Sequence, residues 1–239
     1  MNFLRVSYRF NSRIAVATAV CLVLATFAQH CPAQLELVDI KSIAPTIVID
    51  LRYATPNNVT GHPLYPRGTK ALILPSVAQQ IAGAQKFLRN YNCGLKIWDA
   101  YRPKEAQALL WQLAHKGDYV TNPEGGIGSL HSWGVAVDAT LVDIWGRELN
   151  MPTRFDEFTP QATMYYHGTD PAVQAHLRLL QVAMAANNFY GLRIEWWHFV
   201  TADWKKFVPD ELDNKVNPRQ DVEGAKTKSA AQEKANPKS

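Results

Sequence analysis

Two stretches of this chain pair an imidazole with a carboxylate at spacings that suit metal chemistry. His131 and Asp138 flank Gly134 in the first stretch, and Glu195 lies three residues before His198 in the second. A catalytic Zn²⁺ uses three protein ligands of the imidazole or carboxylate type and keeps a fourth position for water. His131, Asp138 and His198 would make such a set. The alternative is that these groups make ordinary hydrogen bonds on a turn and two strands.

Glu195 is a candidate general base. Trp196 and Trp197 follow it directly, and burial beside them would raise the pKa of its carboxyl group. A raised carboxyl pKa suits a base that works near neutral pH. The sequence therefore predicts a hydrolytic site in which a metal activates water and Glu195 takes the proton. The competing interpretation is that Glu195 only makes hydrogen bonds within an aromatic-rich strand.

Arg102 lies in a third stretch, Asp99–Pro103, between a predicted strand and a predicted helix. Binding residues often gather in such connections. The guanidinium of Arg102 could stabilise the oxyanion of a tetrahedral intermediate. The residues alone favour a salt bridge with Asp99 that fixes the turn, and the sequence leaves both roles open.

The hydrophobic pattern indicates which elements must position these groups. It predicts strands at residues 46–52, 95–99, 135–142 and 194–200, and helices at 75–91, 103–117 and from 171 to before Gly191. Ser76 and Asp170 are the expected N-caps of the first and third helices, and Trp145–Gly146 is the expected hairpin turn. This order predicts a single α+β domain in which a few helices pack against a mainly antiparallel sheet.

The two ends of the chain differ from this domain. Arg5, Arg9 and Arg13 precede an apolar run at residues 14–27, a pattern typical of a secretory signal peptide. The run is short for a membrane span, so we expect cleavage and no stable membrane insertion, and the alternative is an uncleaved signal anchor. We predict a signal peptide at 1–33, a folded domain that carries the candidate metal site at 34–209 and a disordered charged tail at 210–239. Cys93 alone follows residue 33, so we expect no disulfide within the mature chain.

The charge balance gives no reason to expect a nucleic-acid partner. The net charge is +4, of which the three signal-peptide arginines contribute +3. The tail from residue 209 carries six acidic and six basic residues, which leaves the domain at about +1. A nearly neutral domain does not favour nucleic acid or an acidic membrane surface.

The motifs together resemble those of the zinc D-alanyl-D-alanine peptidases, the group that holds the vancomycin-resistance carboxypeptidases and dipeptidases. The paired signature is Ser129-x-His131-x-x-Gly134-x-Ala136-x-Asp138 and Glu195-x-Trp197-His198. Within that group the chain resembles the D-Ala-D-Ala dipeptidases, because these carry a Trp at the position of Trp196, where the carboxypeptidases usually have Pro. The likeness covers roughly residues 36 to 205. Three further motifs agree: Arg52-Tyr53-Ala54-Thr55 with Asn58-x-Thr60-Gly61, Trp98-Asp99-x-Tyr101-Arg102-Pro103, and Met151-x-x-Arg154-Phe155-Asp156.

The resemblance implies a hedgehog-like, D-Ala-D-Ala-peptidase-like fold and a role for each matching residue. It makes His131, Asp138 and His198 the ligands of one Zn²⁺ per chain, Glu195 the general base and Arg102 the arginine that stabilises the transition state. It also implies that Ser129, Tyr53 and Asp156 hold the amino end of the substrate. Val59 stands where the family usually has Phe, which is a modest packing change. The segment between Arg102 and Ser129 is short, so the rim of the pocket, but not the metal site, should differ from the family's.

The expected activity is hydrolysis of the small dipeptide D-Ala-D-Ala in the periplasm or beyond. An aspartate facing a free ammonium selects a dipeptide, because a longer peptide would present an amide there and leave the buried carboxylate unpaired. The first alternative is a D,D-carboxypeptidase or endopeptidase acting on longer peptidoglycan peptides. The second is a non-catalytic zinc-containing module that binds peptidoglycan, although Glu195 and Arg102 would have no use in it.

Overall fold

The computed structural model describes residues 35–114 and 119–209. The chain divides into two units, Met1–Leu35 and Glu36–Ser239, and all the described helices and strands belong to the second. The predicted signal peptide and charged tail lie outside the described residues, so they stay predictions. Within the described part, no helix combines the length and the apolar character that a membrane span requires.

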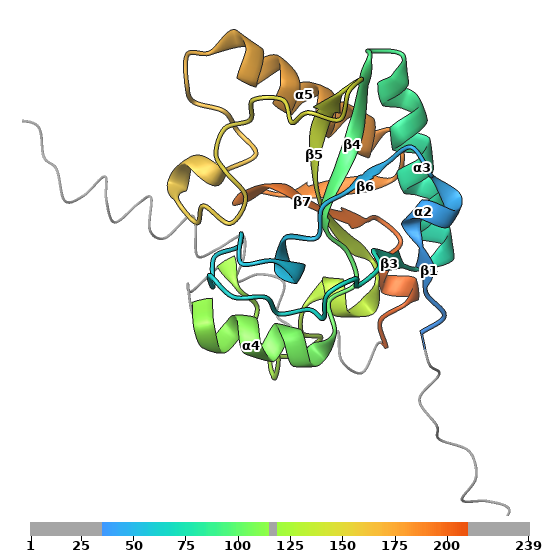
Figure 1. Cartoon of the computed structure of the whole chain (residues 1–239), viewed down its shortest axis with the longest axis vertical. Helices are drawn as coiled ribbons and strands as arrows, with labels where there is room; N and C mark the ends of the chain where they lie inside the picture. Colours follow the sequence, from blue (N-terminus) through green and yellow to red (C-terminus); the bar gives the residue numbers. More distant parts are fainter. Residues whose placement is uncertain (1–34, 115–118, 210–239) are drawn as a thin grey trace, which may run out of the picture. The chain divides into compact units, whose positions relative to one another are not determined.

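A five-stranded sheet in the order β2–β4–β5–β7–β6 carries the fold (Figure 1). Only the β2–β4 pair is parallel within it, and the other three pairs are antiparallel. A separate antiparallel pair joins β1 to β3. The strands are β1 (Val38–Asp39), β2 (Val48–Ile49), β3 (Leu72–Ile73), β4 (Cys93–Asp99), β5 (Ala136–Asp143), β6 (Phe189–Leu192) and β7 (Glu195–Thr201). The predicted α+β class with a mainly antiparallel sheet is confirmed.

Helices α3 (Pro75–Arg89) and α5 (Pro171–Ala185) contact each other, and each contacts the sheet. Their apolar residues recur at helical spacing, so one stripe of each helix is buried. Asp170 caps α5, because its carboxylate accepts from the amides of Ala172 at 2.8 Å and Val173 at 3.4 Å. Helix α2 (Ile40–Ile43) is a single turn, and α4 (Lys104–Ala114) lies apart from α3 and α5 in Figure 1.

Short 3₁₀ turns carry several candidate site residues. Turn η1 (Arg52–Ala54) holds Tyr53, and η3 (Leu130–Trp133) holds His131. Gly134 ends η3 at φ 66°, in the left-handed region that glycine adopts without a steric penalty. The chain can therefore turn from η3 almost directly into β5, which brings His131 close to Asp138. Two further turns are η4 (Pro160–Ala162) and η5 (Trp204–Lys206).

Several details differ from the sequence predictions. Of the predicted strand at 46–52, only Val48 and Ile49 pair, because η1 begins at Arg52. Ser76 does not cap α3: Pro75 takes the first helical position, so the N-cap is Leu74, which makes no side-chain capping bond. Gly191 does not follow the end of α5 but lies inside β6, a strand that the pattern did not predict. The turn at Gly146 is confirmed by the Val142–Glu148 bridge.

The strand register brings distant chemistry together. Asp138 on β5 pairs directly with His198 on β7. Side chains alternate along a strand, so Asp138 and Thr140 share one face of β5, whereas Ala139 and Leu141 face the opposite way and are fully buried.

Candidate active site

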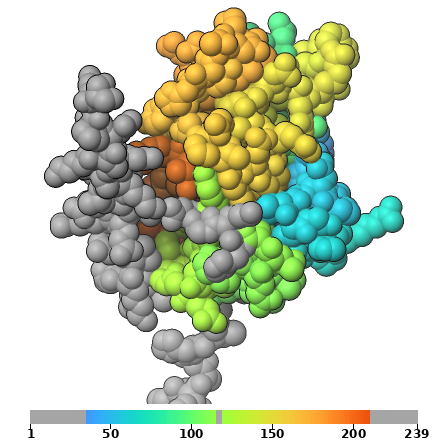
Figure 2. Space-filling view, turned by 90° about the vertical axis from the view of Figure 1, so that its left-hand side faces the viewer, coloured from blue at the N-terminus to red at the C-terminus, as the bar shows by residue number. Residues whose placement is uncertain are grey.

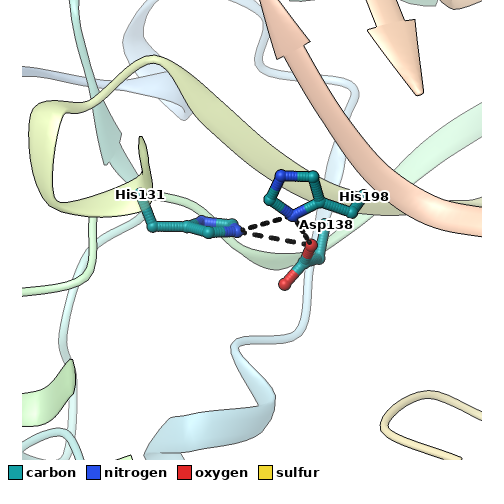
Figure 3. Close-up of side chains that lie close together, drawn as sticks. All are labelled: His131, Asp138 and His198. Atoms are coloured by element: carbon teal, nitrogen blue, oxygen red, sulfur yellow. Dashed lines mark hydrogen bonds and ion pairs between the residues drawn. The ribbon is translucent and has the colours of Figure 1, made fainter. Parts of the chain in front are cut away.

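Three side chains from η3, β5 and β7 converge on one point (Figure 3). His131 Nε2 lies 3.1 Å from His198 Nδ1, and His198 Nδ1 lies 3.1 Å from Asp138 Oδ1. The third side of this triangle, from His131 Nε2 to Asp138 Oδ1, measures 3.4 Å. Among the described residues, these three form a group that could hold a metal ion.

The spacing fits a zinc ion. With bonds of 2.0–2.1 Å, a tetrahedral Zn²⁺ separates its ligand atoms by about 3.3 Å. The orientation of His131 also fits, because its Nδ1 donates to the Ala100 carbonyl oxygen at 2.8 Å and thereby leaves the Nε2 lone pair facing the other two donors. A hydrogen bond of this kind fixes the tautomer of a metal-ligating histidine.

The protonation states also suit a metal site. Burial lowers the pKa of His198, against the hydrogen bond to Asp138, which raises it. Burial would raise the pKa of Asp138, but His131 and His198 hold it below its ordinary value. A neutral imidazole and an ionised carboxylate are the forms that bind a metal.

Glu195 is a buried carboxylate beside this cluster. Its Oε2 lies 4.0 Å from His198 Nδ1. Burial raises the pKa of Glu195 well above its ordinary value, and the carboxylates of Asp138 and Asp156 raise it further, whereas Arg102 lowers it. A raised carboxyl pKa is the property that a general base working near neutral pH requires.

Arg102 fulfils the structural role and also borders the site. Its Nε and Nη2 lie 2.9 Å and 2.7 Å from Asp99 Oδ2, so the predicted salt bridge with Asp99 is present. Its Nη2 is also 3.7 Å from Asp138 Oδ2, and its guanidinium carbon is 4.8 Å from the centre of the Tyr53 ring. The two roles that the sequence left open are therefore compatible.

Two residues that the sequence did not single out hold Arg102 in place. Gln107 Oε1 accepts from Arg102 Nη1 at 2.8 Å, and Tyr65 Oη donates to Asp99 Oδ1 at 2.6 Å. Gln107 lies five residues after Arg102 on α4, a spacing that carries no recognisable motif. Tyr65 belongs to an irregular segment, so neither residue gave a sequence signal.

Asp156 and Tyr53 meet at the other end of the site. The Tyr53 hydroxyl donates to Asp156 Oδ1 at 3.1 Å, and the Val59 amide donates to Asp156 Oδ2 at 3.1 Å. Burial raises the pKa of Asp156 to about 7, against the Val59 bond, which lowers it. Asp156 adopts φ 58°, and this left-handed backbone conformation is uncommon for a residue with a side chain.

All eight predicted site residues line one cavity of about 560 Å³. Ser129, which is buried, takes part in its wall next to His131. The eight residues are Tyr53, Arg102, Ser129, His131, Asp138, Asp156, Glu195 and His198.

A wider hollow of about 910 Å³ lies along Thr140 and also reaches Asp156, but none of the three metal donors borders it. The segment between β5 and α5, which contributes to this hollow, is yellow in Figure 2 and lies below α5. We place the chemistry in the smaller cavity, since it contains the convergent donors.

A three-donor cluster and a carboxyl group of raised pKa in one cavity define a site typical of metal-dependent hydrolases. The chain belongs to the D-Ala-D-Ala dipeptidase family, whose model matches residues 33–217. It is therefore a peptidase, and the resemblance predicted from the motifs is confirmed.

Individual relatives agree with this family. The D-alanyl-D-alanine dipeptidase of Escherichia coli strain K12 is 37% identical over 164 residues, which cover 69% of this chain and 83% of the relative. That of Enterococcus faecium is 28% identical over 172 residues, covering 64% and 85%. A solved structure of the LdcB LD-carboxypeptidase aligns with TM-score 0.42 and 15% identity over 79% of this chain and 81% of that one. A likeness this distant supports no conclusion about the activity of this chain.

Proposed function

We propose that this protein is a zinc-dependent dipeptidase that hydrolyses D-Ala-D-Ala. The observation that carries the proposal is the triangle of His131 Nε2, Asp138 Oδ1 and His198 Nδ1, with sides of 3.1–3.4 Å. Glu195 adjoins this triangle, and Asp156 lines the same cavity. The family and its named relatives support the substrate.

The metal, Glu195 and Arg102 each have a distinct role in hydrolysis. When bound, Zn²⁺ supplies Lewis-acid chemistry that lowers the pKa of water and polarises a carbonyl group. Glu195 accepts the proton of the attacking water and passes it to the leaving amine. The bonds of Arg102 to Asp99 and Gln107 engage three of its five N–H groups, so the guanidinium retains donors for the oxyanion that forms.

Asp156 explains why the substrate is a free dipeptide. Its carboxylate, oriented by Tyr53 and the Val59 amide, faces the cavity where a substrate ammonium would bind. A longer peptide would place a neutral amide against this buried group and would leave it without a charged partner. The site therefore favours a peptide with a free amino group one residue before the scissile bond.

The sequence supports a proposal for the cellular setting. We propose that the protein is exported to the periplasm or beyond, because a basic segment and a short apolar run begin the chain. The partner is the small D,D-dipeptide substrate. A nearly neutral domain gives no support to nucleic-acid binding.

Hydrolysis of a free and a blocked dipeptide tests this function. We expect kcat/KM for D-Ala-D-Ala to exceed that for N-acetyl-D-Ala-D-Ala at least about 100-fold, since a site built for a polar partner rejects analogues that lack it. Preference for the blocked peptide would instead support the D,D-carboxypeptidase alternative. Stoichiometric zinc without hydrolysis of either compound would support the binding module.

A further inference from the structure

We propose that Trp196 is a positioning residue for the amino end of the substrate. Its indole N–H, acting through Thr153, holds the turn that presents Asp156 to the cavity. This inference rests on the proposed dipeptidase function and names a residue that sets how tightly the same site binds a free ammonium. Trp196 lines neither the catalytic cavity nor the wider hollow, so it acts on the substrate only through other residues.

Asp156 lies in a strained turn. The Glu157 amide donates to the Arg154 carbonyl oxygen at 3.3 Å and thereby closes the turn 154–157. Asp156 is the third residue of this turn and adopts φ 58°. A residue with a side chain keeps such a conformation only when its surroundings restrain it. The position of the Asp156 carboxylate therefore depends on the contacts that hold the turn.

Trp196 supplies one such contact from the sheet. Its Nε1 donates to Thr153 Oγ1 at 2.9 Å, and the Thr153 hydroxyl donates in turn to the Arg154 carbonyl oxygen at 3.2 Å. The same carbonyl oxygen accepts the bond that closes the turn. Two consecutive hydrogen bonds thus connect β7 to the turn that carries Asp156.

The Trp196 side chain is fixed well enough to act as a support. It is 1% exposed, and its ring lies edge-on to the rings of Trp98 and Trp197, at 5.7 Å and 5.4 Å between ring centres. A buried indole N–H needs an acceptor, and Thr153 Oγ1 provides it. Glu195 directly precedes Trp196 on β7, so the contact connects the ammonium-binding end of the site to the strand that carries the general base.

The other contacts of Asp156 act on its carboxylate. The Tyr53 hydroxyl and the Val59 amide each donate to one carboxylate oxygen at 3.1 Å. Loss of the bond between Trp196 and Thr153 leaves these contacts in place. We therefore expect the turn to loosen without unfolding, and the carboxylate to bind the substrate ammonium less tightly.

Steady-state hydrolysis of D-Ala-D-Ala by the full-length protein with zinc tests this proposal. Trp196→Phe removes the indole N–H and keeps an aromatic ring, whereas Thr153→Val removes the hydroxyl and keeps the shape. We expect each to raise KM about 3- to 10-fold, which is the worth of one net hydrogen bond. Because the ammonium contact exists in both the bound substrate and the transition state, kcat should stay within about twofold. The double variant should match Thr153→Val, since both changes break the same bond.

Two further variants are the matched controls. Thr153→Ser keeps the hydroxyl and should retain the wild-type KM. Trp98→Phe removes an indole N–H from the same group of packed rings, but this N–H donates to Glu148 Oε1 at 3.1 Å and not to the turn. It should therefore leave KM unchanged.

The outcomes separate this inference from the function on which it rests. A wild-type KM in both Trp196→Phe and Thr153→Val would overturn the role of Trp196 and leave the dipeptidase proposal standing. So would an equal rise of KM in Trp98→Phe. A wild-type protein that hydrolyses no D-Ala-D-Ala would contradict both proposals. Partial unfolding would lower zinc content and apparent kcat but not raise KM, and Thr153→Val provides the test should Trp196→Phe fail to fold.

Discussion

Asp156 is the residue on which selectivity for a free dipeptide depends. Its pKa of about 7 means that, in the free protein, the carboxyl group is largely protonated below pH 7. A bound ammonium favours the ionised form, so substrate binding must remove this proton. Selectivity and pH dependence therefore share one origin.

The acidic side of the pH profile should report Asp156. We expect kcat/KM to fall as the pH drops below about 7, because this parameter reports groups of the free enzyme. The Asp156 titration should be absent from kcat, since the bound ammonium keeps the carboxylate ionised. Asp156→Asn should lower kcat/KM about 10- to 100-fold and make the acidic limb shallower. If the acidic limb of the kcat/KM profile is as steep in Asp156→Asn as in the wild type, this result would contradict the role of Asp156.

The raised pKa of Asp156 also makes the stability of the folded protein depend on pH. Because the folded-state pKa of Asp156 is raised, the unfolded chain loses this proton at lower pH than the folded protein does. Asp156 therefore costs stability as the pH rises from about 4 to 7, and the cost is full above pH 7. Denaturant titrations should show this loss in the wild type and a smaller one in Asp156→Asn.

Single residues were predicted from the sequence with unequal success. The three donors and Glu195 could be proposed from residue chemistry, because their types and spacing suit a metal and a base. The roles of Asp156 and Tyr53 were predicted only from the family resemblance, because the two residues are 103 positions apart and share no local sequence motif. The role of Gln107 was not predicted, because a glutamine on a helix belongs to no distinctive sequence pattern.

Among the elements, the η3–Gly134–β5 connection fixes the metal site. It presents His131 and Asp138 to the same point, and pairing of β5 with β7 adds His198. The sequence predicted strands at 135–142 and 194–200 but not their pairing, because contacts between distant strands leave no local pattern. The sequence did not predict β6, because Gly191 indicated the end of the preceding helix.

Gly134→Ala should disturb this connection. An added Cβ would lie 2.8 Å from Leu37 Cδ2, and φ 66° would be strained. We expect a loss of about 1–3 kcal/mol of stability together with weaker zinc binding. Gly68→Ala is the matched control, because it has φ 82° with nothing within 4 Å of its added Cβ. It should cost about 1 kcal/mol and leave zinc affinity unchanged. Equal zinc affinity in the two variants would contradict the role of Gly134.

For the whole molecule, the sequence was sufficient for the fold class but not for the cavity. Apolar, β-branched runs and segments of helical spacing, in their order along the chain, indicated a mainly antiparallel sheet with helices, and the structure has one. The cavity depends on irregular segments, such as the 119–130 loop that lines it, whose conformations follow from tertiary contacts rather than from periodicity.

The central claim is that one zinc ion and Glu195 act together in peptide hydrolysis. Zinc content and D-Ala-D-Ala turnover, measured side by side in wild type and Glu195→Gln, test it most directly. We predict one zinc per chain in both proteins and a kcat in the variant about 10²–10⁴-fold lower. A Glu195→Gln variant that keeps zinc and turns over within about tenfold of wild type would contradict this mechanism, as would full activity in protein free of zinc.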